Sequence, residues 1–545
     1  MPSTETEPVP DHGVVASNVA DLLARAAARS AGRTALVEVG SGRRVTWGDL
    51  EDEVSRVASG LSRMGLVAGY RVVICTANRT EFVISYLAAL RARLVVVPVN
   101  PRGTTGELVR VILDCGARLV ICDSTTSTQV RSAVGGLEDS VHPADRELGD
   151  RVVVPRLVVC GAHTIPGEVP YAELARAVAG PVPFPQDPEA LAVLLYTSGT
   201  SGRPRAAMLT HRALLANVEQ VASVRPSTIL PDDVVLGVLP LFHVYGLNAV
   251  LAQVISQSAC LVLVDGFDTE GSLDIIEDEA VSVVPVAPAV LAYWMQVEDL
   301  QSRLRGARLV LSGSAPLAPE LLAAFVGRSQ VTVHQGYGLT EAAPAVTSTM
   351  CSTVPKGGSV GSALPGVSVR LVDEAGDQPS GEDAGEISVK GANLFSGYWP
   401  DRSDGPGQDG WWATGDVGFL DADGDLFLVD RLKELVIVSG FNVYPSEVED
   451  VITELDAVAE VAVIGAQDER TGETVVAHVR RSPSSTLSDA QLVELVYEHC
   501  AQRLAGFKQP SAVNVVDELP HTVTGKIARG RLRATARSRK LGLLE

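Results

Sequence analysis

Short β-rich runs alternate with helical patterns through the first 335 residues, and this alternation limits the fold more than any other feature of the chain. Strands alternating with helices are typical of largely parallel sheets with helices on both faces. The predicted fold class is therefore α/β. Strands are predicted at residues 71–75, 94–99, 119–122, 152–160, 234–239, 259–264, 281–286, 308–312 and 331–335. Helices are predicted at residues 20–31, 81–90, 106–114, 214–221, 247–257, 273–279 and 319–326.

The pattern changes after about residue 361, where short strands are split by turns such as DEAG at 373–376 and DADG at 421–424. Short strands joined by such turns indicate a small β-barrel-like subdomain. Beyond residue 431 the pattern is that of an α+β cap. We therefore predict a disordered leader at residues 1–16, a large N-terminal domain of stacked α/β sheets with the subdomain at 17–430, and a small mobile C-terminal domain at 431–545.

Length and composition exclude several classes of protein. A chain of 545 residues is too long for one hydrophobic core and predicts three to four domain-sized units. Hydrophobic residues make up 46% and charged residues 20%, which excludes a mostly disordered or collagen-like chain. The net charge of −21 disfavours nonspecific binding to nucleic acid, so no nucleic-acid partner is expected.

Cysteine usage and the N-terminus indicate a cytoplasmic protein. The seven cysteines are an odd number without CxxC spacing, which predicts reduced packing residues. The first 13 residues contain acids and prolines where a signal peptide needs basic and then apolar residues. Residues 234–264 carry no charge and are long enough to cross a bilayer, but Pro240, His243 and Asn248 interrupt them. We predict a buried strand, turn and helix there, and keep peripheral association with the inner face of the membrane as an alternative.

A loop rich in glycine and hydroxyl groups follows the apolar run at residues 191–195. Its residues are Thr197, Ser198, Gly199, Thr200, Ser201 and Gly202. Glycines allow backbone N–H groups to approach an anion, hydroxyls add donors, and Arg203 and Arg205 add positive charge. The loop is not a P-loop, because no Gly-Lys-Ser/Thr ends it. Taken alone, it is either a phosphate site or a plain connection.

Four more motifs follow in order: QGYGLTE at residues 335–341, WATGD at 412–416, DRLK at 430–433 and TGK at 524–526. Together with the loop they resemble the adenylate-forming superfamily of acyl-CoA synthetases, peptide-synthetase adenylation domains and luciferases, over residues 45–533. The motifs are most similar to those of bacterial fatty acyl-CoA synthetases. The resemblance implies attack of a carboxylate on the α-phosphate of ATP, giving acyl-AMP and pyrophosphate, and then transfer of the acyl group to a thiol. The cofactors it implies are ATP, Mg²⁺ and coenzyme A.

The resemblance also assigns roles within the nucleotide site. Thr197, Ser198, Gly199, Thr200 and Gly202 are expected to hold the β- and γ-phosphates, with Arg205 where a lysine is common and Ala206 in place of a usual glycine. Gly313, Ser314 and Ala315 match the adenine-side loop, and Tyr337 with Gly338 is expected to pack on adenine. Thr340 is expected to donate to the α-phosphate, while Glu341 and Thr200 hold Mg²⁺. Asp416 fits the ribose diol, and Arg431 a second ribose or phosphate contact.

Without the resemblance, these residues have plainer interpretations. Tyr337 is then a core tyrosine, Glu341 an acid at a helix N-terminus and Asp416 a turn residue. His243, in PLFHVYG, resembles a gatekeeper beside the acyl carboxylate, but a histidine among apolar residues is otherwise a satisfied core group. Leu247 and Val250, in the uncharged stretch after it, are candidates for the wall of an acyl tunnel.

Site residues are also expected near the C-terminus. They serve the two half-reactions, which are formation of acyl-AMP and transfer of the acyl group to the thiol. Lys526, in PHTVTGKI, resembles the lysine inserted between the attacking carboxylate and the α-phosphate, although His521 stands where a basic residue is usual. Lys433 matches the hinge between the two domains. Gly440 and Phe441 match the loop that lines the pantetheine channel, and Ile437 stands where some members carry a lysine.

Several functions are consistent with these motifs. A fatty acyl-CoA ligase, with a small-molecule carboxylic acid and CoA as partners, is the first of them. A fatty acyl-AMP ligase would instead load an acyl carrier protein, but enzymes of that kind usually hold an extra segment that the compact run 410–433 lacks. The chain ends 19 residues after Lys526, so no fused carrier domain is expected. An aromatic-acid CoA ligase and a non-catalytic homologue are the remaining alternatives.

Overall fold

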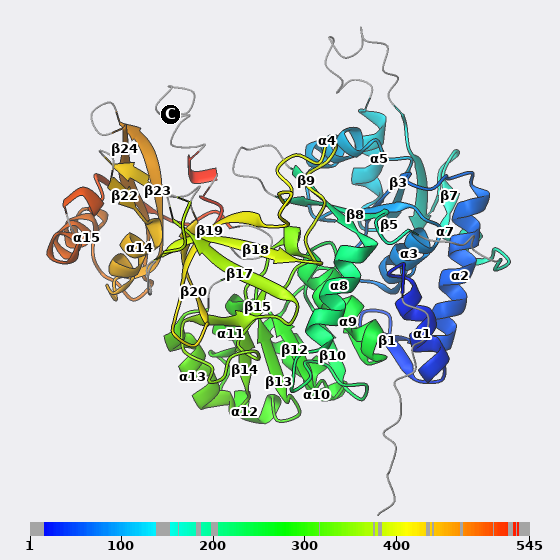
Figure 1. Ribbon diagram of the computed structural model, residues 1–545, viewed down its shortest axis with the longest axis horizontal. Helices are drawn as coiled ribbons and strands as arrows, with labels where there is room; N and C mark the ends of the chain where they lie inside the picture. The colour runs from blue at the N-terminus through cyan, green and yellow to red at the C-terminus, as the bar shows by residue number, and fades with distance from the viewer. Residues whose placement is uncertain are drawn as a thin grey trace, which may run out of the picture. The chain divides into compact units, whose positions relative to one another are not determined.

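The computed structural model describes residues 16–137, 153–161, 163–180, 187–197, 205–315, 317–373, 376–379, 384–431, 436–438, 441–468, 472–504, 506–521, 527–529 and 531–533. The chain divides into two compact units. Unit 1 comprises residues 1–195, 208–219 and 229–266, and unit 2 comprises residues 196–207, 220–228 and 267–545. Figure 1 shows both units, with labels on many of their helices and strands. The predicted leader at 1–16 lies almost wholly outside the described residues, and the predicted boundary after residue 430 stays a prediction.

The main sheet of unit 1 has the strand order β7-β6-β5-β3-β4-β8-β9. Its strands are β7 (Val169–Pro170), β6 (Arg156–Cys160), β5 (Leu119–Asp123), β3 (Arg71–Cys75), β4 (Val95–Pro98), β8 (Leu191–Thr197) and β9 (Arg205–Thr210). The pairings from β7 to β8 are all parallel, which confirms the prediction of a parallel sheet. In β3, Val72, Val73 and Ile74 are fully buried, as expected of a strand covered on both faces.

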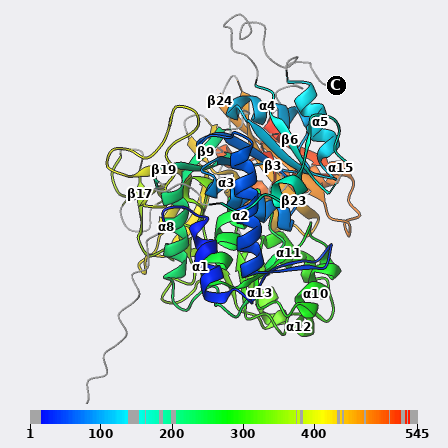
Figure 2. The ribbon, with the colours of Figure 1, turned by 90° about the vertical axis from the view of Figure 1, so that its right-hand side faces the viewer.

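A second group of strands in unit 1 has the order β10-β11-β1-β2. These strands are β10 (Val234–Gly237), β11 (Cys260–Leu263), β1 (Thr34–Glu38) and β2 (Arg43–Thr46). The helices are α1 (Asp21–Ser30), α2 (Trp47–Arg63), α3 (Thr80–Arg91), α4 (Thr105–Cys115), α5 (Ser127–Gly135), α7 (Tyr171–Ala175), α8 (His211–Ala222) and α9 (Gln253–Gln257). Helices α1 and α3 both pack against α2, as Figures 1 and 2 show.

Local capping explains where several of these helices begin and end. Thr104 and Glu107 form a reciprocal capping box at the start of α4, and Gly116 ends this helix in the left-handed conformation, with φ 58°. The side chain of Thr46 accepts a hydrogen bond from the Asp49 amide at the start of α2. Each cap satisfies a backbone group that the helix itself leaves unpaired.

The uncharged stretch at 234–264 forms β10, a π-helix η1 (Tyr245–Ala252), α9 and β11. The buried side chain of Asn248 donates to the carbonyl of Leu214 at 3.1 Å, and that of Gln253 donates to the carbonyl of Val218 at 2.8 Å. These two amides tie the segment to α8, which confirms the predicted buried strand, turn and helix. No helix in the described part of the chain combines the length and apolar character needed to span a bilayer.

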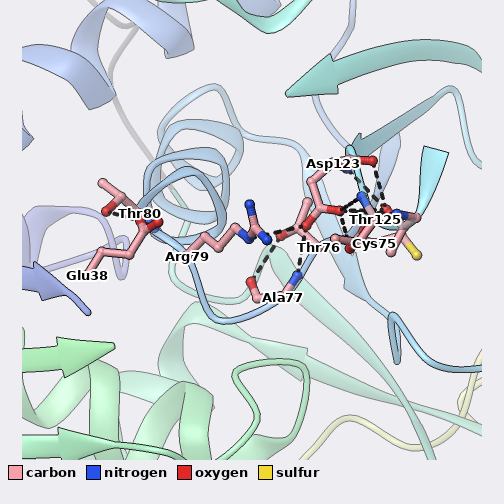
Figure 3. A network of polar contacts seen from close by, with 9 residues as sticks. Glu38, Cys75, Thr76, Ala77, Arg79, Thr80, Asp123 and Thr125 are labelled. Carbon is pink, nitrogen blue, oxygen red and sulfur yellow. Dashed lines mark hydrogen bonds and ion pairs between the residues drawn. The ribbon is translucent and has the colours of Figure 1, made fainter. Parts of the chain in front are cut away.

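A polar network lies at the carboxyl ends of β3 and β5 (Figure 3). Asp123, which is 2% exposed, accepts hydrogen bonds from the Ala77 amide at 3.2 Å and from the amide and hydroxyl of Thr125 at 2.8 and 2.6 Å. Arg79 adds an ion pair at 3.7 Å. Burial acts to raise the pKa of Asp123, but the hydrogen bonds and Arg79 together hold it below its usual value. The network therefore stabilises the two loops at this edge of the sheet.

All seven cysteines are free thiols, which agrees with the prediction of reduced packing residues. Five of them are buried. Burial raises the pKa of Cys75 and of Cys115 to about 12, so neither is a reactive thiolate at neutral pH.

We expect the stability of unit 1 to fall as the pH drops from 6.5 to 4, because of His211. Its Nδ1 accepts from the Val19 amide at 3.2 Å, and burial lowers the pKa of His211 to about 4. Between these pH values the unfolded chain binds a proton that the folded chain does not, so folding loses roughly 3 kcal/mol by pH 4. Urea unfolding at pH 7 and pH 5 measures this. The pH dependence should shrink in His211→Asn but not in a control variant of the exposed His163, and equal slopes in all three proteins would refute the assignment.

Unit 2 contains a parallel group of three strands, β12 (Val283–Val286), β13 (Leu309–Ser312) and β14 (Val333–Gln335). Its helices are α10 (Thr269–Asp278), α11 (Pro288–Trp294), α12 (Leu300–Arg303), α13 (Pro319–Ser329) and the short 3₁₀ helix η2 (Thr340–Ala342). A separate antiparallel sheet has the order β15-β16-β20-β19-β18-β17 and occupies the region predicted as the β-rich subdomain. Its strands are β15 (Thr347–Ser348), β16 (Ser359–Ala363), β20 (Leu426–Arg431), β19 (Trp412–Leu420), β18 (Gly385–Gly391) and β17 (Val367–Val372).

The last part of the chain is α+β, as predicted. Its strands are β21 (Val436–Val438), β22 (Phe441–Val443), β23 (Val458–Asp468), β24 (Gly472–Arg481) and β25 (Ala512–Val516), and its helices are α14 (Pro445–Thr453), α15 (Asp489–Arg503) and the 3₁₀ turn η4 (Gly506–Lys508). A core of Val463, Ala477, Leu492, Val496 and Cys500, each fully buried, joins β23 and β24 to α15.

Candidate active site

Thr197 and Arg205 mark the two ends of the predicted phosphate loop. Thr197 is the last residue of β8 rather than the first residue of the loop, because the strand runs two residues beyond its apolar run. Its hydroxyl donates to the carbonyl of Arg205 at 3.3 Å, so the ends of the loop lie together. Ser198, Gly199, Thr200 and Gly202 lie outside the described residues. Strand β9, which starts directly at Arg205, was not predicted from the sequence.

The side chain of Arg205 has two protein partners. Its guanidinium lies over the ring of Tyr398, 3.7 Å from the ring centroid, and its Nη2 lies 2.5 Å from Oδ2 of Asp404. The sequence predicted a phosphate contact for this arginine and gave no sign of either partner. Since Asp404 is 70% exposed at its side chain, the ion pair is weak and leaves Arg205 able to exchange partners.

The GYGLTE segment starts at the carboxyl end of β14, next to the loop that follows β13. Gly313, Ser314 and Ala315 leave β13, and Ser314 has a φ of 74°. Because β13 and β14 are parallel neighbours, these two segments emerge at the same edge, where α/β sheets bind ligands. The predicted adenine-side residues are therefore brought together.

The glycines on either side of Tyr337 serve backbone packing. A Cβ at Gly336 would lie 2.5 Å from the carbonyl oxygen of Thr347, and one at Gly338 would lie 2.5 Å from that of Pro344. The absence of a Cβ at both positions therefore lets the 344–347 segment approach the turn, which fixes the backbone of Tyr337.

Tyr337 and Asp416 form a buried pair. The tyrosine hydroxyl donates to Oδ2 of Asp416 at 2.6 Å, and the two residues are 7% and 8% exposed. Asp416 lies on β19 and is in register with Arg431 on β20. The predicted adenine-packing residue is thus joined to the predicted ribose-binding carboxylate, although they are 79 positions apart.

Glu341 lies in η2 directly after Thr340 and is 8% exposed. Its Oε1 accepts a hydrogen bond from the hydroxyl of Tyr398 at 2.5 Å, and its backbone carbonyl accepts from the Phe395 amide at 2.8 Å. Burial and the neighbouring Glu341 carboxylate raise the pKa of Tyr398, so this hydroxyl keeps its proton and remains a donor. The carboxylate is therefore oriented by Tyr398 and belongs to the residue next to Thr340.

His243 belongs to unit 1 and follows a turn that Asn78 holds. The Asn78 amide donates to the carbonyls of Gly237 and Leu239 at 3.1 and 2.9 Å, and its oxygen accepts from the Leu241 amide at 2.9 Å. The π-helix η1 begins two residues after His243. Asn78 was not singled out in the sequence, because its partners are more than 150 positions away.

The remaining predicted residues belong to the last part of the chain. Arg431 is the last residue of β20, and Phe441 is the first residue of β22. Lys433, Gly440 and Lys526 lie outside the described residues. Sequence reasoning missed Tyr398, Asp404 and Asn393, which share the aromatic-rich segment before WATGD; the concentration of aromatic residues there was the available signal.

Two protein-family models match this chain. Residues 23–399 match the family described as AMP-binding enzyme, and residues 447–526 match its C-terminal domain. The chain belongs to the AMP-binding enzyme family. The first match includes Thr197, Arg205, Tyr337, Glu341 and Tyr398, and Asp416 lies between the two matched ranges.

Relatives of this AMP-binding enzyme are similar over nearly their whole length. A 4-coumarate–CoA ligase of rice (Oryza sativa subsp. japonica) is 31% identical over 92% of this chain and 89% of its own. A long-chain-fatty-acid–CoA ligase of Bacillus subtilis is 31% identical over 94% and 93%. The crystal structure of ATP-bound MatB from Rhodopseudomonas palustris has a TM-score of 0.84 at 31% identity, covering 96% of this chain and 99% of MatB. The α/β fold with its small C-terminal domain is thereby confirmed.

Proposed function

We propose that this chain is an ATP-dependent ligase that activates an apolar carboxylic acid as acyl-AMP and transfers the acyl group to coenzyme A. A medium- or long-chain fatty acid is the first candidate for the acid. The observation that carries the proposal is the turn from Tyr337 to Glu341, which joins Asp416 at one end and Tyr398 at the other. The similarity to fatty-acid and 4-coumarate ligases supports CoA as the acceptor.

The donor set of the turn fits Mg²⁺. Glu341 and Thr340 supply a carboxylate and a hydroxyl, and Mg²⁺ prefers oxygen ligands of this kind. In the described part of the chain, no three His, Cys, Asp or Glu side chains are grouped to hold a metal ion. Mg²⁺ is usually held in proteins by one or two carboxylates together with substrate phosphates. When bound, Mg²⁺ would neutralise part of the phosphate charge.

The protein residues then have separate tasks in adenylation. Tyr337 and Asp416 hold the nucleoside end of ATP, and Thr340 donates to the α-phosphate. Lys526 stabilises the negative charge that accumulates as the carboxylate approaches that phosphate. Two anions must meet in this step, so preorganised positive charge and donors lower the barrier. Leu247, Val250 and Leu251, which are buried in the uncharged stretch, are proposed to exclude water from the acyl chain.

The substrate class is tested by incubating the protein with Mg-ATP and a panel of acids, with and without CoA. We expect pyrophosphate release with every accepted acid, acyl-CoA only when CoA is present, and the highest kcat/KM with medium- or long-chain fatty acids. A higher kcat/KM with 4-coumarate than with any fatty acid would show that the substrate is an aromatic acid. Acyl-AMP that accumulates unchanged when CoA is added would instead favour an acyl carrier protein as acceptor.

The proposed hinge at Lys433 predicts that the two half-reactions can be separated. Lys433→Pro should fix the backbone φ there and restrict domain rotation. Thioester formation should then fall by about tenfold more than acyl-AMP formation. Rapid-quench measurement of each step checks this, with Lys433→Ala as the matched control that keeps the backbone free. Equal losses in both steps would exclude Lys433 from the hinge.

A further inference from the structure

The segment from Asn393 to Tyr398 holds the Glu341 turn at three points. The Asn393 amide donates to the carbonyl of Ala342 at 2.7 Å, and the Phe395 amide donates to the carbonyl of Glu341 at 2.8 Å. The Tyr398 hydroxyl donates to the Glu341 carboxylate itself, at 2.5 Å. Both the backbone and the side chain of Glu341 are therefore positioned by one short segment.

The same segment is bound to the exit of the phosphate loop. The Trp399 amide donates to the carbonyl of Ala206 at 2.9 Å, and Tyr398 forms an antiparallel bridge with Ala207. The Arg205 guanidinium lies on the ring face of Tyr398, 3.7 Å from its centroid. Tyr398 thus contacts the arginine at the loop exit with its ring and Glu341 with its hydroxyl.

Tyr398 is itself held in place by a tight turn. Its amide donates to the Ser403 carbonyl at 2.9 Å, and its carbonyl accepts from the Arg402 amide at 2.8 Å. Gly397 has a φ of 92°, and a Cβ there would lie 2.3 Å from the Arg402 carbonyl oxygen, so the turn requires glycine. The ring packs edge-on against Phe395, with centroids 5.0 Å apart. These contacts leave the hydroxyl little freedom to move.

We propose that Tyr398 is a positioning residue of the adenylation site, which orients the Glu341 carboxylate through its hydroxyl and steadies Arg205 through its ring. The proposal rests on the proposed function, because that function gives the Glu341 carboxylate a cation to bind. A hydrogen bond to one carboxylate oxygen restricts rotation of the carboxylate plane. The other oxygen keeps its lone pairs free to bind a metal ion. Removing a partner that orients a metal ligand typically lowers metal affinity by about 10- to 100-fold. A cation on an aromatic face adds a smaller stabilisation.

Tyr398→Phe tests the hydroxyl alone, because phenylalanine keeps the ring beneath Arg205. Binding of Mn²⁺ in the presence of α,β-methylene-ATP, measured by the EPR signal of free Mn²⁺, should weaken about 10-fold. In the adenylation assay, the Mg²⁺ concentration at half-maximal rate should rise by a similar factor, and saturating Mg²⁺ should restore most of kcat. Tyr293→Phe, at a tyrosine that is 51% exposed, is the matched control and should leave both values unchanged.

The outcomes separate this proposal from the proposed function. An active wild type together with a Tyr398→Phe variant of unchanged Mn²⁺ affinity would overturn the positioning role alone. A wild type that binds neither Mn²⁺ nor the nucleotide would overturn both. Thermal unfolding of each variant shows whether it folds, and Tyr398→Trp, which also lacks the hydroxyl, should weaken Mn²⁺ binding in the same direction.

Discussion

Replacing Lys526 with alanine should slow formation of acyl-AMP by about 10²- to 10³-fold, the effect of losing one preorganised charged donor at a developing charge. The lysine is expected to neutralise negative charge as the carboxylate meets the α-phosphate. Acid-dependent exchange of pyrophosphate into ATP measures this step directly. Thioester formation from synthetic acyl-AMP should persist, because domain rotation is expected to have moved Lys526 away by then.

Two comparisons make the Lys526 result specific. Stability should change by no more than about 0.5 kcal/mol, since a lysine in a loop contributes little to a core. Lys390→Ala, at an exposed lysine on β18, should leave both half-reactions unchanged. Near-normal acyl-AMP formation in Lys526→Ala would show that another cation serves the step. Equal damage to both half-reactions would indicate misfolding or a single fixed domain arrangement.

Glu341→Gln should lower the rate of adenylation by about 10²-fold, and the loss should be larger at low Mg²⁺. Glutamine has nearly the same shape and can still accept the hydrogen bond from Tyr398, but it removes the charge that binds a hard cation. Pyrophosphate release measured as a function of Mg²⁺ concentration separates the lower affinity from the lower maximal rate.

The control for this variant is Glu320→Gln, which changes an exposed glutamate in the first turn of α13. It should leave the Mg²⁺ dependence unaltered. A Glu341→Gln protein with the wild-type Mg²⁺ dependence would remove Glu341 from the metal site. It would then be a buried acid held by Tyr398 for structural reasons alone.

Much of the α/β framework could be predicted from the sequence, because its strands are short apolar runs between turns. The predicted strands at 71–75 and 119–122 correspond to β3 and β5 within one residue. Periodicity also located α3 and α13. Periodicity did not predict the π-helix η1. An uncharged apolar segment has no alternation of polar and apolar residues that would distinguish a π-helix from an α-helix.

Site residues could be predicted where they belong to a short sequence motif. Contacts between residues that are far apart in the sequence could not be predicted. QGYGLTE and WATGD indicated Tyr337, Glu341 and Asp416, but not that Tyr337 and Asp416 share a hydrogen bond. Arg205 was expected at phosphate, while its contacts with Tyr398 and Asp404 join positions almost 200 residues apart. Such pairings depend on how the strands are ordered, which no local pattern encodes.

Transfer of ¹⁸O from a carboxyl-labelled acid is the most direct test of the central claim, that the acid is activated at the α-phosphate of ATP. In that reaction one carboxylate oxygen becomes bonded to the α-phosphorus and stays there when CoA takes the acyl group. We predict AMP that carries one ¹⁸O per acyl-CoA formed, together with unlabelled pyrophosphate. Formation of ADP with ¹⁸O in inorganic phosphate would contradict the account, because the acid would then have attacked the γ-phosphate.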